Sequence, residues 1–141
     1  MIREDGYHIL AYGQVPLNRF TDTPHEYFFR PSLQTLNQIY NRATILIKAS
    51  RYDARACAPL EAMTKGCVTV RALDLGDDDL IHDVNCIRIP YGNEADLYRE
   101  AKNLLTDNER LSRLMGNCYE YVQKYSWDYW MPQIERILLN G

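Results

Sequence analysis

The 141-residue sequence has 46% apolar residues, 25% charged residues and a formal net charge of -3, a composition typical of globular proteins. No apolar run approaches the roughly 18 residues of a membrane-spanning helix, and residues 1–5 lack the basic-then-apolar plan of a signal peptide. The basic residues are scattered, which argues against a nucleic-acid partner. We expect one cytoplasmic domain over residues 1–141, because this length supports one core and not two.

The first two thirds of the chain alternate short apolar runs with helical patterns. Strands are predicted over residues 8–12 and 26–30, and Ser32 then caps a helix that continues to Ala43. Residues 44–49 (TILIKA) are apolar on both faces, which is typical of a central parallel strand. A helix after Ala58, closed by Gly66, precedes strands over residues 67–70 and 86–90. The alternation predicts an α/β fold, with a doubly wound Rossmann-like parallel sheet covered on both faces.

The last third of the chain is predicted to be helical, with apolar residues at helical spacing. The pattern forms three stripes: Leu97, Ala101, Leu104 and Leu105; then Leu111, Leu114, Met115, Cys118 and Val122; then Trp130, Ile134, Ile137 and Leu138. Such stripes usually face a core. We therefore expect all three to be buried, with no chemical role.

Neither a metal nor a resident cofactor is predicted. The four cysteines, Cys57, Cys67, Cys86 and Cys118, form no C-x-x-C pair and have no histidine at zinc-like spacing, so we interpret them as reduced core residues. The acidic residues at 74–79 could bind Mg²⁺ or Mn²⁺, but adjacent loop carboxylates usually point apart into water. The three histidines are far apart in sequence and pair with no nucleophile motif, so hydrolase chemistry has no support.

Candidate site residues follow the strand that ends at Ala49, since open α/β sheets bind ligands at the carboxyl ends of their strands. The segment from residue 50 to residue 63 contains two carboxylates, Asp53 in the loop and Glu61 on the helix. These could accept hydrogen bonds from sugar and ribose hydroxyls, while backbone N–H groups at the helix start would favour a diphosphate. The alternatives are that Asp53 is a turn residue and Glu61 an early-helix acid.

The same segment resembles the C-terminal domain of retaining glycosyltransferases of family four, which have the GT-B fold and a Glu-x7-Glu motif. The resemblance covers roughly residues 33 to 138. It rests on SRYD at 50–53, PLEAM at 59–63, Gly66 and VTV at 68–70, and continues through DLIHDVN at 79–85, IRIP at 87–90 and YSWD at 125–128.

The resemblance implies that this chain is the donor-binding half of a glycosyltransferase. Such an enzyme transfers a sugar with retention from a nucleoside-diphosphate sugar to a hydroxyl of a glycan, lipid or protein acceptor, and needs no metal. Glu61 would then hold the ribose and Asp53 the sugar, while the amides of Ala56 and Cys57 would hold the phosphates. Ser50, Arg51 and Arg55 complete the predicted donor site.

Three departures from the family pattern bear on activity. Asp53 stands where the family has a longer glutamate, and ARAC at 54–57 replaces a glycine-rich turn, so a Cβ crowds the approach of a ligand. Arg55 could compensate by binding phosphate, or could face solvent. The family's upstream Arg and Lys and its N-terminal acceptor domain have no counterpart in this sequence. Lys48 and Arg51 are the nearest basic candidates, although a strand lysine often only extends to solvent.

We therefore expect the chain alone to be inactive, and to gain any peripheral membrane association only through the N-terminal half that it lacks. Two rival hypotheses remain. One is a degenerate or regulatory nucleotide-binding module, which the altered turn favours. The other is a flavodoxin-like receiver or partner-binding domain, which has the same sheet but binds no nucleotide sugar.

Overall fold

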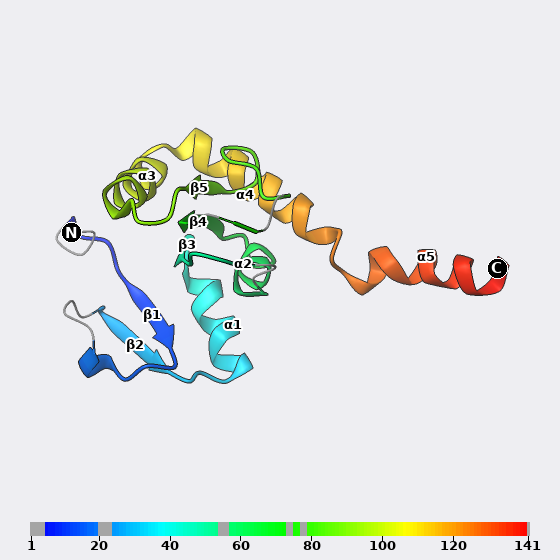
Figure 1. Ribbon diagram of the computed structural model, residues 1–141, viewed down its shortest axis with the longest axis horizontal. Helices are drawn as coiled ribbons and strands as arrows, with labels where there is room; N and C mark the ends of the chain where they lie inside the picture. The colour runs from blue at the N-terminus through cyan, green and yellow to red at the C-terminus, as the bar shows by residue number, and fades with distance from the viewer. Residues whose placement is uncertain (1–4, 20–23, 54–56, 73–74, 77–78, 141) are drawn as a thin grey trace.

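The computed structural model describes residues 5–19, 24–53, 57–72, 75–76 and 79–140, in which parallel strands alternate with helices (Figure 1). The elements are β1 (Leu10–Gly13), the short 3₁₀ helix η1 (Leu17–Arg19), β2 (Glu26–Phe29), α1 (Leu33–Arg42), β3 (Ile45–Ala49), α2 (Cys57–Met63), β4 (Val68–Ala72), β5 (Ile87–Ile89), α3 (Glu94–Thr106), α4 (Asn108–Gln123) and α5 (Trp127–Asn140). The predicted α/β class and the order of the elements are confirmed.

The described strands form two parallel sheets. One contains β1 and β2, and the other has the order β3-β4-β5. In the second sheet Ile45 pairs with Val68 and Val70 pairs with Ile87. We expected β3 to lie at the centre of one sheet, but within the described residues β3 is an edge strand, and its Ile47 is 39% exposed. The strand was predicted correctly, but the expectation of a neighbour on each side was wrong, because among the described residues β3 pairs only with β4.

Ser32 and Gly66 set the start of α1 and the end of α2, as the sequence predicts. The Ser32 hydroxyl accepts a hydrogen bond from the Thr35 amide (3.1 Å) and begins α1. Gly66, with a φ of 83°, follows α2 and donates its amide to Met63, as a helix-ending glycine does. α2 begins at Cys57, earlier than predicted, and includes Pro59 in its first turn, where the missing proline N–H costs no intrahelical bond.

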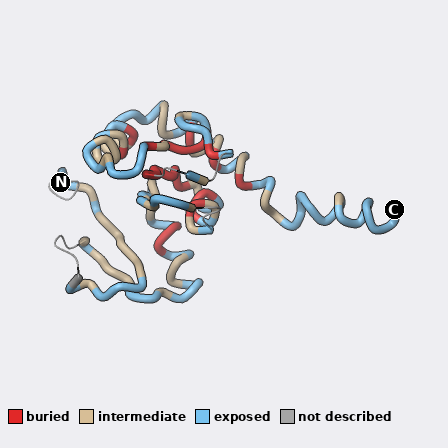
Figure 2. Tube along the Cα trace, in the orientation of Figure 1, coloured by how far each residue is buried: buried red, intermediate tan, exposed pale blue. Residues whose placement is uncertain are grey.

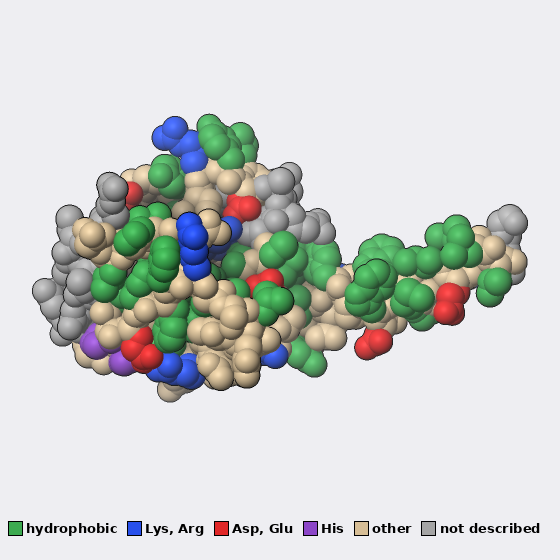
Figure 3. All heavy atoms as spheres, turned by 90° about the horizontal axis from the view of Figure 1, so that it is seen from below, with side chains coloured by type: hydrophobic (Ala, Val, Ile, Leu, Met, Phe, Trp, Pro, Cys, Tyr) green, Lys and Arg blue, Asp and Glu red, His purple; other side chains and the backbone are tan. Residues whose placement is uncertain are grey.

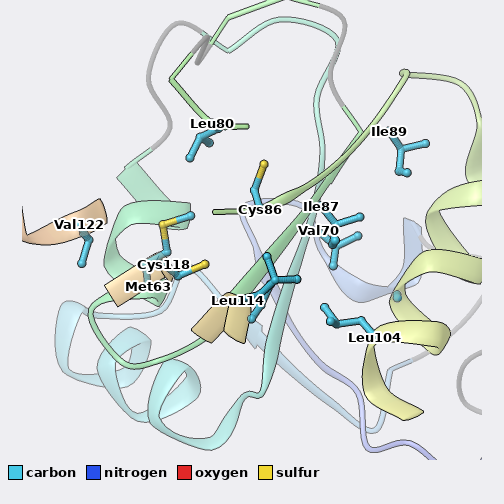
Figure 4. Packing of buried hydrophobic residues seen from close by; sticks show 12 residues of the cluster. Met63, Val70, Leu80, Cys86, Ile87, Ile89, Leu104, Leu114, Cys118 and Val122 are labelled. Carbon is cyan, nitrogen blue, oxygen red and sulfur yellow. The ribbon is translucent and has the colours of Figure 1, made fainter. Parts of the chain in front are cut away.

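The main core joins the three-stranded sheet to α2, α3 and α4 (Figure 4). Val70 of β4 and Ile87 of β5 are fully buried among Leu104 of α3, Leu114 of α4 and Met63 of α2. The first two predicted stripes contribute Ala101, Leu104, Leu114, Cys118 and Val122 to this core. A smaller core of Tyr40, Ala62 and Cys67 lies where α1 meets α2.

The third predicted stripe is not buried, which corrects the sequence expectation. α5 extends away from the rest of the chain (Figure 1), and it is exposed along its length (Figure 2). Trp130 is 47% exposed and Leu138 is 76% exposed. Helical periodicity predicts an apolar face but not what covers that face, and no described element packs over α5. Hydrophobic side chains gather along this projecting helix (Figure 3).

The cysteines are free thiols, and three of them are buried as expected. Cys57 is the exception, because it is the exposed first residue of α2. Among the described residues no helix combines the length and the apolar character needed to cross a membrane.

Candidate functional site

The chain that leaves β3 runs beside the chain that leaves β4, and this places residues 50–53 at the carboxyl edge of the three-stranded sheet. The Ser50 amide donates to the Ala72 carbonyl (2.9 Å) and the Asp53 amide to the Leu75 carbonyl (3.2 Å). Tyr52 and Leu75 form an isolated parallel bridge. The sheet hydrogen bonding thus continues into the loop, and Asp53 is held close to the ends of both strands.

Three basic residues lie in one row across this edge of the sheet. Lys48 on β3 is the register partner of Arg71 on β4, and Arg71 is the partner of Arg88 on β5. Register partners in a parallel sheet direct their side chains to the same face. Like charges on neighbouring strands repel one another, so such a row requires nearby carboxylates or a bound anion.

Asp53 supplies one such carboxylate. Its Oδ2 accepts hydrogen bonds from Lys48 Nζ at 2.5 Å and from Arg71 Nη2 at 3.0 Å. The Arg71 side chain is only 1% exposed, whereas 17% of Asp53 and 31% of Lys48 remain exposed. Burial of Arg71 makes its charge partners important for stability. Asp53 is therefore not a simple turn residue, and it also fixes two cations at the strand ends.

Glu61 belongs to a different network. It is exposed on α2, and its Oε2 accepts a hydrogen bond from Tyr40 Oη of α1 at 3.3 Å. Tyr40 Oη also lies 2.9 Å from Tyr12 Oη of β1. Because α2 starts at Cys57, Glu61 lies in the second turn of the helix, not in the first as the sequence suggested. Its interaction with the helix dipole is correspondingly weaker.

The tyrosines beside Glu61 stay protonated. Burial is the main reason that the pKa of Tyr40 lies well above its ordinary value, and the hydrogen bond with Tyr12 raises it further. Burial likewise raises the pKa of Tyr12. A protonated Tyr40 can donate to Glu61 at any ordinary pH. Glu61 is therefore oriented by its neighbour, and keeps acceptor capacity for a ligand.

The remaining predicted donor-site residues are only partly described. Arg51 is exposed, and its guanidinium lies 5.3 Å from the centre of the Tyr91 ring, which follows β5. Cys57 is exposed at the start of α2. Arg55 and Ala56 lie outside the described residues. Asp53 and Glu61 belong to separate hydrogen-bond networks, since Asp53 accepts from Lys48 and Arg71 whereas Glu61 accepts from Tyr40.

Sequence reasoning missed Arg71, and it gave no site role to Arg88 or Tyr40. The predicted strand ended at Val70, which left Arg71 as an ordinary loop residue, whereas β4 continues to Ala72. A signal was present, because an arginine between Val70 and Ala72 at a strand end is unusual in an apolar run and lies where α/β sheets bind ligands. Tyr40 gave no such signal, since a tyrosine on an apolar helix face usually indicates core packing.

The acidic stretch is only partly described. Asp79 accepts a hydrogen bond from Tyr125 Oη, and Asp74, Asp77 and Asp78 lie outside the described residues. Among the residues that are described, no three histidine, cysteine or acidic side chains gather closely enough to hold a metal ion.

Comparison with solved structures identifies the class of fold. Residues of this chain superpose on the C-terminal domain of a glycosyl transferase group 1 family protein, LpcC, from Francisella tularensis, with a TM-score of 0.65 and 19% identity. They also superpose on S. aureus TarM, solved as a mutant in complex with Fondaparinux, alpha-GlcNAc-glycerol and UDP, with a TM-score of 0.61 and 18% identity. The chain has the Rossmann-like fold of one half of a GT-B glycosyltransferase, as its sequence motifs suggested.

The matches cover 74% and 76% of this chain, but only 55% of the LpcC chain and 23% of the TarM chain. No family model matches the sequence. No curated protein matches it either. At identities below 20% the structural likeness establishes the fold, and the activity has to be argued from the site.

Proposed function

We propose that this chain is the donor-binding half of a glycosyltransferase and binds a nucleoside-diphosphate sugar at the carboxyl edge of β3, β4 and β5. The observation that carries the proposal is the row of Lys48, Arg71 and Arg88 at this edge, with Asp53 hydrogen-bonded to the first two. Glycosyltransferases share this fold, and TarM was solved with UDP. Cations at the strand ends suit a diphosphate in the position where α/β sheets bind ligands.

The residues support a division of roles. Lys48 and Arg51 are basic groups that solvent reaches, as is the half-buried Arg88, so they would contact the diphosphate, while buried Arg71 would position Asp53. Both hydrogen bonds to Asp53 end on Oδ2, and a carboxylate has acceptor sites on both oxygens, so Asp53 can still accept from a sugar hydroxyl. Glu61, oriented by Tyr40, would accept from the ribose hydroxyls.

In this proposal the chain contributes positioning and charge. As the diphosphate leaves, negative charge develops on it, and Lys48 and Arg51 would neutralise that charge. The sugar would be transferred with retention, as the family resemblance of residues 50–63 implies, and no metal would be needed. The acceptor would bind on a second wall that these residues do not form.

A binding module without catalysis is the second candidate. It is favoured by the engagement of Asp53 with Lys48 and Arg71, because a carboxylate committed to a structural role has less freedom to reach a sugar. Such a module would bind the nucleotide but show no transfer, even when an acceptor half is supplied.

Calorimetry with UDP, GDP, ADP and dTDP tests the proposal. We expect one of them to bind weakly, at high micromolar to millimolar concentration, because the described residues would form only one wall of the proposed cleft. Lys48→Gln should weaken that binding roughly tenfold or more, since charge-assisted hydrogen bonds are worth about 1.5–3 kcal/mol. Lys65→Gln is the matched control, because Lys65 is exposed beyond the opposite end of β4. EDTA should leave binding unchanged. Absence of binding for all four nucleotides at millimolar concentration would rule the proposal out.

A further inference from the structure

The two sheets flank a cavity of about 910 Å³ that lies between the outer edge of β1 and the outer edge of β3. Every residue of β3 lines the cavity, as do Leu10, Ala11 and Tyr12 of β1. Tyr40 of α1 and Leu105 of α3 line it as well. A volume near 900 Å³ is at the upper end for pockets that bind small molecules, so volume alone leaves the occupant open.

The hydrogen-bonding pattern of β3 directs polar backbone groups into this cavity. The Val68 amide donates to the Thr44 carbonyl, and the Ser50 amide donates to the Ala72 carbonyl, so residues 44 and 50 face β4. Backbone groups alternate sides along a strand, so the amides and carbonyls of Ile45, Ile47 and Ala49 point away from β4.

The same reasoning applies to β1. The Ile9 carbonyl accepts from the Glu26 amide, and the Gly13 carbonyl accepts from the Arg30 amide, so residues 9 and 13 face β2. The amides and carbonyls of Leu10 and Tyr12 therefore point away from β2, and both residues line the cavity. Two strand edges thus present alternating donors and acceptors to the same space.

The sequence of β3 is also wrong for an edge strand. Edge strands are normally protected by charges, prolines or bulges, whereas the single charge of β3, Lys48, follows a continuous apolar run at residues 45–47 (ILI). Runs that are apolar on both faces are typical of strands with a neighbour on each side. An extended polypeptide backbone matches donors and acceptors that alternate at the strand repeat on both walls, whereas an acyl chain has none and the hydroxyls of a sugar do not follow that repeat.

We propose that the cavity receives an extended apolar strand of a partner polypeptide, which pairs in parallel with β1 on one side and with β3 on the other. The completed order would be β2-β1-strand-β3-β4-β5, which is the order of a doubly wound sheet with its first strand supplied from elsewhere. A strand in this position would join β1 and β3 into one continuous parallel sheet. The proposal is independent of any nucleotide.

Amide hydrogen exchange followed by NMR tests the proposal with the full chain. The probe is a synthetic peptide of four consecutive valines flanked by two lysines at each end, because the net charge of the chain is -3. Without the peptide, we expect the amides of Ile45 and Ile47 to exchange much faster than those of Leu46 and Lys48, which face β4. With millimolar peptide, the amides of residues 10, 12, 45, 47 and 49 should slow at least tenfold.

Two variants separate strand pairing from simple apolar contact. Ile47→Pro removes an N–H that points into the cavity and leaves the bonds to β4 in place, so the chain should fold but lose the peptide-induced protection. Ile47→Ala removes the side chain and keeps the N–H, so it should retain most of that protection.

Three results would overturn the proposal. The first is protection of the five amides in the chain alone, which would mean that the two sheets close on each other. The second is no change with the peptide. The third is protection that rises with chain concentration and is accompanied by a dimer mass, which would make a second copy of this chain the occupant.

Discussion

Glu61 is the residue whose substitution best separates ligand binding from folding. Glu61→Gln keeps the shape and can still accept the hydrogen bond from Tyr40, but it removes the negative charge. If Glu61 binds the ribose, the nucleoside affinity should fall by about 1.5–3 kcal/mol, because an amide offers one acceptor oxygen where a carboxylate offers two. The melting temperature should barely change, since Glu61 is exposed and beyond the first turn of α2. Calorimetry and thermal melting measure the two effects.

Asp53→Asn is the comparison variant, and the structure changes what is expected of it. From the sequence, Asp53→Asn should weaken only the intact nucleotide sugar. Because Asp53 is an ion-pair partner of buried Arg71, its neutralisation should also lower the free energy of unfolding, by about 1–3 kcal/mol. If Glu61→Gln instead melts far lower and binds nucleotide normally, then Glu61 is structural and the proposed ribose contact is wrong.

The position of the site could be predicted from single residues, but its charge pairing could not. Asp53 lies at a strand end, as the rule for α/β sheets predicts. Its partner Arg71 is 18 positions away and meets Asp53 only because β3 and β4 pair in one particular register. The sequence pattern does not specify that register to the residue, because apolar runs such as 44–49 fit a neighbour equally well when shifted by two positions.

Among the elements, the ends of the helices were easier to predict than the surfaces against which their apolar faces pack. Local groups decide a helix end: Asn93 and Asp107 accept hydrogen bonds from amides three residues later and begin α3 and α4. α5 begins at Trp127 in the same way, where the Ser126 hydroxyl accepts from the Tyr129 amide. Whether the apolar face of α5 is covered depends on a partner surface, which lies outside the local sequence.

Removal of α5 should therefore cost the remaining chain little. We expect deletion of residues 127–141 to change the free energy of unfolding by no more than about 1 kcal/mol, because no described residue of α5 is buried. It should also reduce self-association, since Trp127, Leu138 and Leu139 are each at least 75% exposed. Urea unfolding and sedimentation measure the two effects.

Deletion of residues 108–141 is the control for this truncation. It also removes α4, whose Leu114 and Cys118 are fully buried in the main core, and it should prevent cooperative folding. If the shorter deletion is as damaging as this one, α5 packs against the chain in solution and is not a projecting helix.

At the scale of the whole molecule, the separation of the strands into two sheets is the feature that the sequence could not reveal. Each strand was predicted from its own residues, and each exists. The pairing of β1 with β2 and the cavity beside β3 depend on which other strands are present to compete for those edges. A continuous apolar run predicts neighbours on both sides, and does not specify which segment supplies each of them.

Thiol labelling should reveal whether the smaller core opens before the main core. At pH 8 we expect exposed Cys57 to react with a disulfide reagent first. Burial raises the pKa of Cys67 to about 11 and that of Cys118 to about 12, so their thiolates are scarce and inaccessible until the protein opens. Cys67 belongs to the small core with Tyr40, which borders the cavity, whereas Cys86 and Cys118 belong to the main core. Cys67 should therefore react before Cys86 and Cys118, because the smaller core borders the cavity and should open at a lower free energy than the whole protein.

Mass spectrometry of the labelled peptides measures the order, and Cys57→Ser removes the fast background. The valine peptide at millimolar concentration should slow the labelling of Cys67 and not that of Cys86 or Cys118. Its pairing with β1 and β3 would hold the small core against the three-stranded sheet. Equal rates for Cys67, Cys86 and Cys118 would mean that both cores open together as one cooperative unit. The cavity would then be a rigid feature of the fold and not its weakest point.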